Sequence, residues 1–265
     1  MLYYPQLPTG TVAQYPLRKT LLKRTIVNDC LDSRTVKLAD VAAAQVEWQL
    51  NYAGLTQTEW DSLKTLFLAA GGRLQTFVFL DPTDNLLRFS EELSSTVWQK
   101  DPLVQVTAGV SDPLGTARAT SVANSAVVSQ KISQTVEAAG WFGYSFSVYV
   151  RSGAVGAVTL TRRTADGSDS ITEITGPAWR RLQRFAYVDG TAEAIVFELA
   201  IPAGATVEVF GFQVEAQPQP SVYKKTGNQG GVYRATRFSQ DSVAPVAVGP
   251  NDYAVQIQLF SKAGS

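Results

Sequence analysis

Residues 44–53, AQVEWQLNYA, alternate between apolar and polar side chains, and this stretch decides the class of the fold. The two sets of side chains are Val46, Trp48, Leu50 and Tyr52 against Glu47, Gln49 and Asn51. A period of two over this length is typical of a strand that buries one face. We therefore expect a half-buried strand here, and Gly54 is expected to end it.

The residues that follow this strand predict a helix with two start signals. The Thr56 side chain can accept a hydrogen bond from the third helical N–H, and the Glu59 side chain can reach back to the cap residue Thr56. This is the capping-box pattern. Leu55 and Trp60 occupy the positions of a hydrophobic staple. One helical face then carries apolar residues until two glycines stop the helix: Trp60, Leu63, Phe67 and Ala70, followed by Gly71 and Gly72.

After the helix comes a β-prone run at 74–80, closed by the turn residues of 81–85, DPTDN. Asp81 and Asp84 are also the kind of acid pair that binds a metal or works as acid and base. Both fit a turn whose backbone they hydrogen-bond, and we favour that interpretation. Asp166 and Asp169 similarly offer oxygens to calcium, but the spacing of an EF-hand is absent.

The block 48–85, WQLNYAGLTQTEWDSLKTLFLAAGGRLQTFVFLDPTDN, resembles the N-terminal region of phage minor tail and distal tail proteins. The shared features are a strand, a helix with a Glu-Trp pair, a Gly-Gly cap, an aromatic strand and an Asp-Pro turn. The resemblance implies a structural protein that forms a homohexameric ring. Such a ring joins the tail tube protein to the hub and tip proteins at the baseplate of the virion, after synthesis in the host cytoplasm.

The composition of the sequence changes after Phe89, where helical periodicity disappears and Ser, Thr, Ala, Val and Gly dominate. Turn clusters such as 111–115 and 202–204 separate short β-like runs. Many short strands at this spacing predict a sandwich or jelly roll. The expected strands are 103–107, 126–132, 143–151, 157–162, 181–188, 194–201 and 206–213.

This middle segment resembles the carbohydrate-binding-like jelly-roll module of phage tail and spike proteins. The stretches that carry the resemblance are Trp98, 112–117, 130–134, 144–153, 179–181, 212–215 and 221–223. The resemblance implies a fold and leaves a sugar ligand open, since one fold hosts many functions. Trp98, Trp141 and Trp179 are the candidate glycan contacts, although a tryptophan is more often part of the core or edge of a sandwich.

The closing residues 253–260 alternate again, and a lone strand must join an earlier sheet. We expect it to pair with the first segment. The predicted fold is therefore mainly β. A small, discontinuous, β-barrel-like tail domain with one α-helix covers 1–89 and 221–265, and an inserted sandwich or jelly-roll domain covers 90–220. A change of composition marks the first boundary between the two domains, and Pro218 and Pro220 mark the second.

Composition removes several function classes. The chain has no His and a single Cys, Cys30, which excludes Ser-His-Asp and Cys-His catalysis and His-based zinc sites. Lys+Arg and Asp+Glu balance at 23 each, so no general attraction to nucleic acid is expected. No apolar run approaches the roughly 20 residues that span a bilayer. We predict a protein without enzyme activity, cofactor, metal, specific nucleic-acid binding or membrane insertion.

Two functions follow as hypotheses. The first is the structural tail-tip protein described above, in which ring contacts belong to the tail domain. The second is a peripheral receptor-binding tail protein that binds, or less often cleaves, a bacterial surface glycan. Cleavage needs two carboxylates held about 5–10 Å apart, and the sequence selects no such pair.

Overall fold

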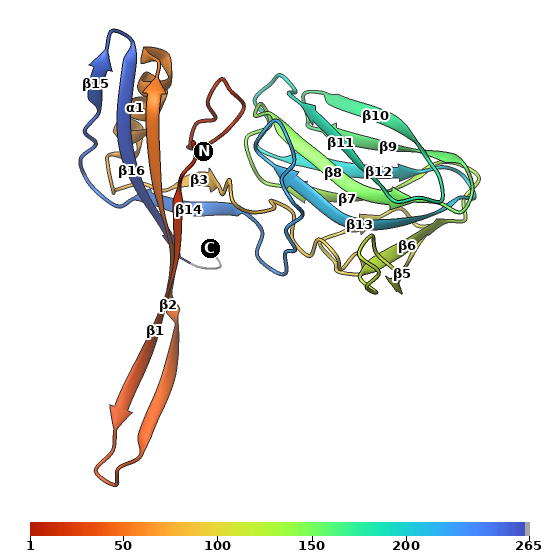
Figure 1. Cartoon of the computed structure of the whole chain (residues 1–265), viewed down its shortest axis with the longest axis horizontal. Coiled ribbons are helices and arrows are strands. Elements are labelled where there is room, and N and C mark those ends of the chain that lie inside the picture. The colour runs from red at the N-terminus through yellow and green to blue at the C-terminus, as the bar shows by residue number, and fades with distance from the viewer. Residues whose placement is uncertain (263–265) are drawn as a thin grey trace. The chain divides into compact units, whose positions relative to one another are not determined.

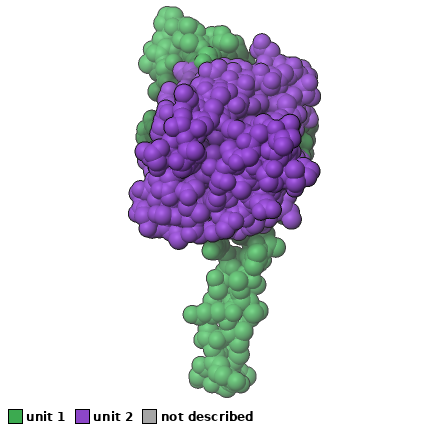
Figure 2. All heavy atoms as spheres, turned by 90° about the vertical axis from the view of Figure 1, so that its right-hand side faces the viewer, with its two compact units in different colours: residues 1–8, 13–79, 233–265 green, residues 9–12, 80–232 purple. Residues whose placement is uncertain are grey.

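The computed structural model describes residues 1–262, which form a mainly β chain with one helix and separate into two compact units. Unit 1 contains Met1–Pro8, Ala13–Phe79 and the described residues from Tyr233 onward. Unit 2 contains Thr9–Val12 and Leu80–Val232. Figure 1 traces the strands and Figure 2 colours the two units. Each unit is described by itself below.

Unit 1 is built on a six-stranded sheet with the order β1-β2-β16-β14-β3, to which β15 adds by pairing with β16. The order begins at β1 and ends at β3, and the described strands form no closed barrel, so the barrel-like part of the prediction is wrong. The bounds are β1 Arg18–Asp29, β2 Thr35–Leu55, β3 Phe77–Leu80, β14 Val232–Phe238, β15 Val246–Gly249 and β16 Asp252–Lys262.

The last strand completes the sheet begun by the first segment, as predicted. In the antiparallel pair of β16 and β2, Leu259 lies opposite Trp48 and Ile257 lies opposite Leu50. All four side chains are buried. Residues about two hundred positions apart in sequence therefore share one core, since the period of two places them on the same face of the sheet.

The helix α1, Gln57–Ala70, confirms the predicted start and stop signals. The capping box of Thr56 and Glu59 is present, and Gly71 adopts the left-handed conformation, with φ of 61°, that ends many helices. Trp60, Leu63, Leu66 and Ala70 are buried. Phe67 is half-buried instead and packs edge-on against Phe238, with ring centroids 5.1 Å apart.

The most extended feature of unit 1 is the ribbon formed by β1 and the first half of β2 (Figure 1), which was not predicted from the sequence. Antiparallel pairing runs from Arg18 opposite Gln49 to Asp29 opposite Thr35. A large bulge interrupts it, because Leu22 pairs with Gln45 while Arg24 pairs with Asp40. Below, the arm means residues 21–41, and its tip carries the exposed Cys30.

Unit 2 confirms the predicted sandwich. Its two five-stranded sheets have the orders β10-β9-β12-β7-β4 and β11-β8-β13-β6-β5. Phe146 of β8 packs against Phe197 of β12 at 5.3 Å, which joins the two sheets in one core. The bounds are β4 Gln99–Lys100, β5 Val104–Val110, β6 Ala119–Asn124, β7 Gln130–Val136, β8 Tyr144–Arg151, β9 Gly156–Arg163, β10 Ser168–Thr175, β11 Arg180–Ala186, β12 Ile195–Ile201 and β13 Thr206–Glu215.

The units divide the chain at 79/80 and 232/233, whereas the sequence suggested 89/90 and 220/221. Buried Asn85 gives a physical reason. Its side-chain amide donates to the carbonyls of Phe212 and Lys224, and its side-chain oxygen accepts from the N–H of Val214. Asn85 and Lys224, which lie outside the predicted insert 90–220, are thereby hydrogen-bonded into the sandwich. Asp81 acts as the expected turn former, because its carboxylate accepts the N–H and the hydroxyl of Thr83.

Candidate functional site

The arm of unit 1 carries an unusual number of exposed apolar side chains. Most large apolar residues of a folded chain are buried, and contiguous exposed ones mark interaction surfaces. Figure 2 shows the arm as a thin projection of unit 1. Its exposed large apolar residues are Leu21, Leu22, Ile26, Val27, Leu31, Val36, Leu38 and Val41.

The register of the arm gives its two faces different chemistry. Residues opposite each other share a face, and neighbours along a strand alternate between faces. One face carries Ile26 opposite Leu38 and Asn28 opposite Val36, and next to them the ion pair of Arg24 and Asp40 at 3.7 Å. On the other face the opposite pairs are Thr25 with Ala39, Val27 with Lys37 and Asp29 with Thr35.

Within the described part of the chain, both edges of the arm lack a neighbouring strand. β1 ends the strand order and pairs with β2. The pairing of β2 with β16 stops at Gln45, so 35–44 has no strand on the side away from β1. The opposite end of the sheet differs, because Tyr4 donates its N–H to the Val78 carbonyl at 2.8 Å and covers the edge of β3. Unpaired N–H and C=O groups on a strand edge are a template for another strand.

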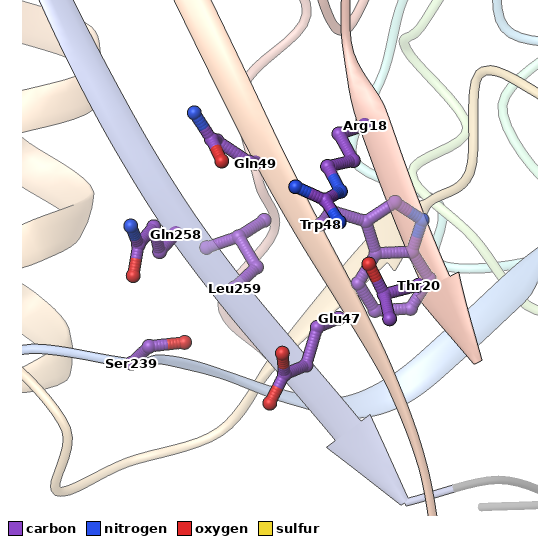
Figure 3. A pocket seen from close by; sticks show the side chains of 8 residues that line it. All are labelled: Arg18, Thr20, Glu47, Trp48, Gln49, Ser239, Gln258 and Leu259. Atoms are coloured by element: carbon purple, nitrogen blue, oxygen red, sulfur yellow. The ribbon is translucent and has the colours of Figure 1, made fainter. Parts of the chain in front are cut away.

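A polar cavity of about 330 Å³ lies on the same sheet, next to the arm, where β1, β2 and β16 pair (Figure 3). Gln49 of β2 lies opposite both Arg18 of β1 and Gln258 of β16. Glu47 is the only carboxylate among the lining residues, so this cavity does not offer the carboxylate pair of a glycosidase. The lining residues are Arg18, Thr20, Glu47, Trp48, Gln49, Ser239, Gln258 and Leu259.

The three candidate glycan contacts occupy different settings in unit 2. Trp98 is buried, packs 4.9 Å from Phe212 and donates its indole N–H to the Phe89 carbonyl at 2.9 Å, so its ring belongs to the core. Trp179 is half-buried, with the guanidinium of Arg151 4.8 Å from its ring centroid. Trp141 is 37% exposed and has the most accessible ring of the three.

The outer face of one sheet of unit 2 is covered by its own chain. Buried Glu215 accepts the N–H and hydroxyl of Ser221 at 2.8 and 2.6 Å and pairs with Lys224 at 2.8 Å. Arg181 donates to the Ser221 carbonyl at 2.7 Å, and Gln213 accepts the Lys224 N–H at 2.7 Å. A ligand cannot lie along these residues of β11 and β13 while residues 221–224 occupy them.

Asp166 and Asp169, the two acids weighed as calcium ligands, serve structural contacts. Asp166 accepts the N–H groups of Thr191 and Ala192 at 2.8 Å each. Asp169 is bonded twice by Arg184 at 2.8 Å, and those hydrogen bonds lower the pKa of Asp169. Between Met1 and Lys262 no group of three or more His, Cys, Asp or Glu side chains is arranged to hold a metal ion. Over the same residues, no helix has the length and apolar character needed to cross a membrane.

Comparison with known proteins finds no matching family model and no matching curated protein. Among solved structures, the chain is similar to the enzymatically active domain of bacteriophage CBA120 tailspike protein 4, at 14% identity and a TM-score of 0.41. The alignment covers 51% of this chain and 22% of that one, so this chain spans about a fifth of the tailspike domain.

Carbohydrate-binding modules are also similar. The CBM22-1 xylan-binding domain of Paenibacillus barcinonensis Xyn10C has 16% identity and a TM-score of 0.43, with 54% of this chain and 100% of that one covered. The C-terminal family 22 module of Clostridium thermocellum Xyn10B has 16% identity, the same coverage and a TM-score of 0.45. At such identities and TM-scores, none of these likenesses bears on what this chain binds.

Proposed function

We propose that this chain is a structural protein of a phage tail tip that assembles into a ring of its own copies through the arm of unit 1. The observation that carries the proposal is the arm, which exposes Ile26, Val36 and Leu38 on one face and has two open strand edges. An isolated two-stranded ribbon is at best marginally stable in water, so a partner that covers it is favourable.

The geometry of the two edges favours a ring over a two-fold dimer. The open edges belong to different strands, β1 and the 35–44 part of β2. If the β1 edge of one copy pairs with the β2 edge of the next, the two edges of each copy contact two different neighbours. Such a contact is head-to-tail. Contacts of this kind close into a ring when the rotation between copies divides a full turn.

The place of the ring in a virion rests on the resemblance of 48–85 to distal and minor tail proteins. In that setting the partners are the tail tube protein and the hub or tip proteins, and the ring contains six copies. The proposed role is non-enzymatic, in keeping with the absence of histidine from the chain and the single carboxylate of the polar cavity.

Sedimentation velocity of the full chain tests the proposal. The double variant Ile26→Asp/Leu38→Asp places charges on this face of the arm and should convert a closed oligomer into a monomer. Val127→Asp is the matched control, because Val127 is an exposed apolar residue of unit 2. A wild-type chain that stays monomeric at all concentrations, or an arm variant that assembles like wild type, overturns the proposal.

A second candidate function is glycan binding by unit 2, as in a receptor-binding tail protein. The observation that favours it is that two aromatic rings of unit 2, those of Trp141 and Tyr187, are 37% and 49% exposed. Open aromatic faces are the surfaces on which sugar rings stack. The test is whether the full chain binds bacterial surface oligosaccharides at all, in solution or on an array.

A further inference from the structure

Two segments of unit 2, one after β7 and one at the end of β11, each carry a contacting pair of aromatic side chains. The loop 137–143, between β7 and β8, carries Trp141 and Phe142, whose ring centroids are 5.9 Å apart. Tyr187 begins the loop between β11 and β12 and packs edge-on against Phe185, at 5.1 Å. Phe142 is buried, whereas Trp141 and Tyr187 remain open to solvent.

Gly143 brings the two aromatic pairs together. A Cβ at this position would lie 2.6 Å from the Phe185 ring and 2.7 Å from the Tyr187 ring, closer than any side chain tolerates. The two rings therefore rest directly on the backbone that follows Trp141 and Phe142. Gly143 thus links the two ring pairs, and the four residues are called here the aromatic cluster (Trp141, Phe142, Phe185 and Tyr187).

A buried arginine fixes the loops that carry this cluster. Arg162 of β9 is 3% exposed and donates to the carbonyl of Gly140 in one loop and to that of Ala186 at the start of the other. The Gly140 N–H also donates to the Ala192 carbonyl at 2.7 Å. The open rings thus sit on loops held in one arrangement, which reduces the entropy lost when a ligand binds.

The three loops at the cluster carry charge of one sign, and the nearby Arg184 is paired with Asp169. Loops 137–143, 164–167 and 187–194 contain acids and no Lys or Arg, and their acids are Glu137, Asp166, Asp189 and Glu193. The cationic group of Arg162 is buried and bound to carbonyl groups. Carboxylates accept hydrogen bonds from sugar hydroxyls or amines and repel an acidic sugar.

We propose that the aromatic cluster and its acidic rim form a binding site for a hexose ring, neutral or amine-bearing, of a bacterial surface glycan. The inference rests on the second proposed function and specifies its site and ligand class. The apolar face of the sugar stacks on Trp141, and Tyr187 and Asp189 bind hydroxyl or amine groups at its edge. The outer sheet face of β11 and β13 stays excluded, because residues 221–224 fill it.

The experiment applies the full chain to an array of bacterial surface oligosaccharides with neutral, amino and acidic hexoses, and then measures each hit by calorimetry. Trp141→Ala should weaken binding about tenfold, the effect of losing one aromatic stack. Asp189→Asn should weaken amino sugars more than neutral ones. Val155→Ala, which removes an exposed apolar side chain elsewhere in unit 2, should bind like wild type.

The outcomes separate the site from the function. Wild-type binding that falls in Trp141→Ala, with circular dichroism and melting temperature unchanged, supports the site. Wild-type binding that Trp141→Ala and Tyr187→Ala both leave intact overturns the site and keeps glycan binding. Preference for acidic oligosaccharides overturns the ligand class. A wild-type chain that binds no oligosaccharide overturns the second proposed function and the site with it.

Discussion

Thr56 and Glu59 bind each other's backbone at the start of α1. The Thr56 hydroxyl accepts the Glu59 N–H at 3.3 Å, and the Glu59 carboxylate accepts the Thr56 N–H at 2.8 Å. Thr56→Ala should lower the free energy of unfolding of unit 1 by about 0.5–2 kcal/mol, because one cap acceptor is lost. Thr65→Ala, at an exposed position inside the same helix, is the control and should not destabilise. Equal thermal melts for Thr56→Ala and wild type would mean that the cap contributes nothing.

Truncation after Gly249 should unfold unit 1 and leave unit 2 folded. The deletion removes β16 from between β2 and β14. It also removes buried Val255, Ile257 and Leu259, each worth roughly 1.5–3 kcal/mol of burial. Limited proteolysis should degrade unit 1 rapidly and leave a resistant fragment near 80–232. A protease-resistant unit 1 in the truncated chain would refute the discontinuous organisation.

Asp112 should make the stability of unit 2 depend on pH in the acid range. Burial alone would raise the pKa of Asp112, but hydrogen bonds from Thr116, Leu114 and Arg118 outweigh it and lower that pKa to about 2. Because the folded pKa is depressed, the stabilisation is complete above the ordinary pKa near 4. It is lost as pH falls from about 4 toward 2.

Asp112→Asn measures this contribution. At pH 7 the variant should lose about 1–3 kcal/mol, since an amide cannot accept all the hydrogen bonds that converge on the carboxylate. The gap between wild type and variant should narrow as pH approaches 2, where Asp112 itself is protonated. Chemical denaturation at several pH values checks this, and a gap that does not change with pH would be incompatible with the assigned role.

The parts of the fold that were predicted correctly rest on local signals. The capping box and Gly71 both lie within one helix length, so tertiary contacts hardly change what these signals predict. The alternation of apolar and polar residues over 44–53 predicts one buried face, and the apolar residues of that face are buried in the core. The pairing of β16 with β2 followed from elimination, because a strand at the end of the chain needs a sheet to join.

The arm was missed because alternation reveals a strand only when a single face is buried. Both faces of the arm are exposed, and neighbours such as Ile26 and Val27 are apolar on opposite faces. β10 was missed because 166–169 resembles a turn. The strand begins at Ser168, and Asp169 is held by Arg184 of β11.

The candidate site could be found from sequence only in part. Trp98, Trp141 and Trp179 look equivalent by composition, and only tertiary packing distinguishes a core ring from an open one. The roles of Tyr187 and Arg162 could not be predicted from the sequence. Arg162 joins two loops that are more than forty residues apart in the chain. The need for glycine at 143 also becomes visible only in the structure, where the rings of Phe185 and Tyr187 lie against it.

A cryo-EM map of the intact tail tip tests whether the arms form the ring. We expect copies of this chain in a closed ring on the tail axis, with the β1 edge of each arm hydrogen-bonded to the 35–44 edge of its neighbour. The faces with Ile26, Val36 and Leu38 should be buried against protein. Single copies at the periphery of the tail, with arms that touch no other arm, would contradict the account.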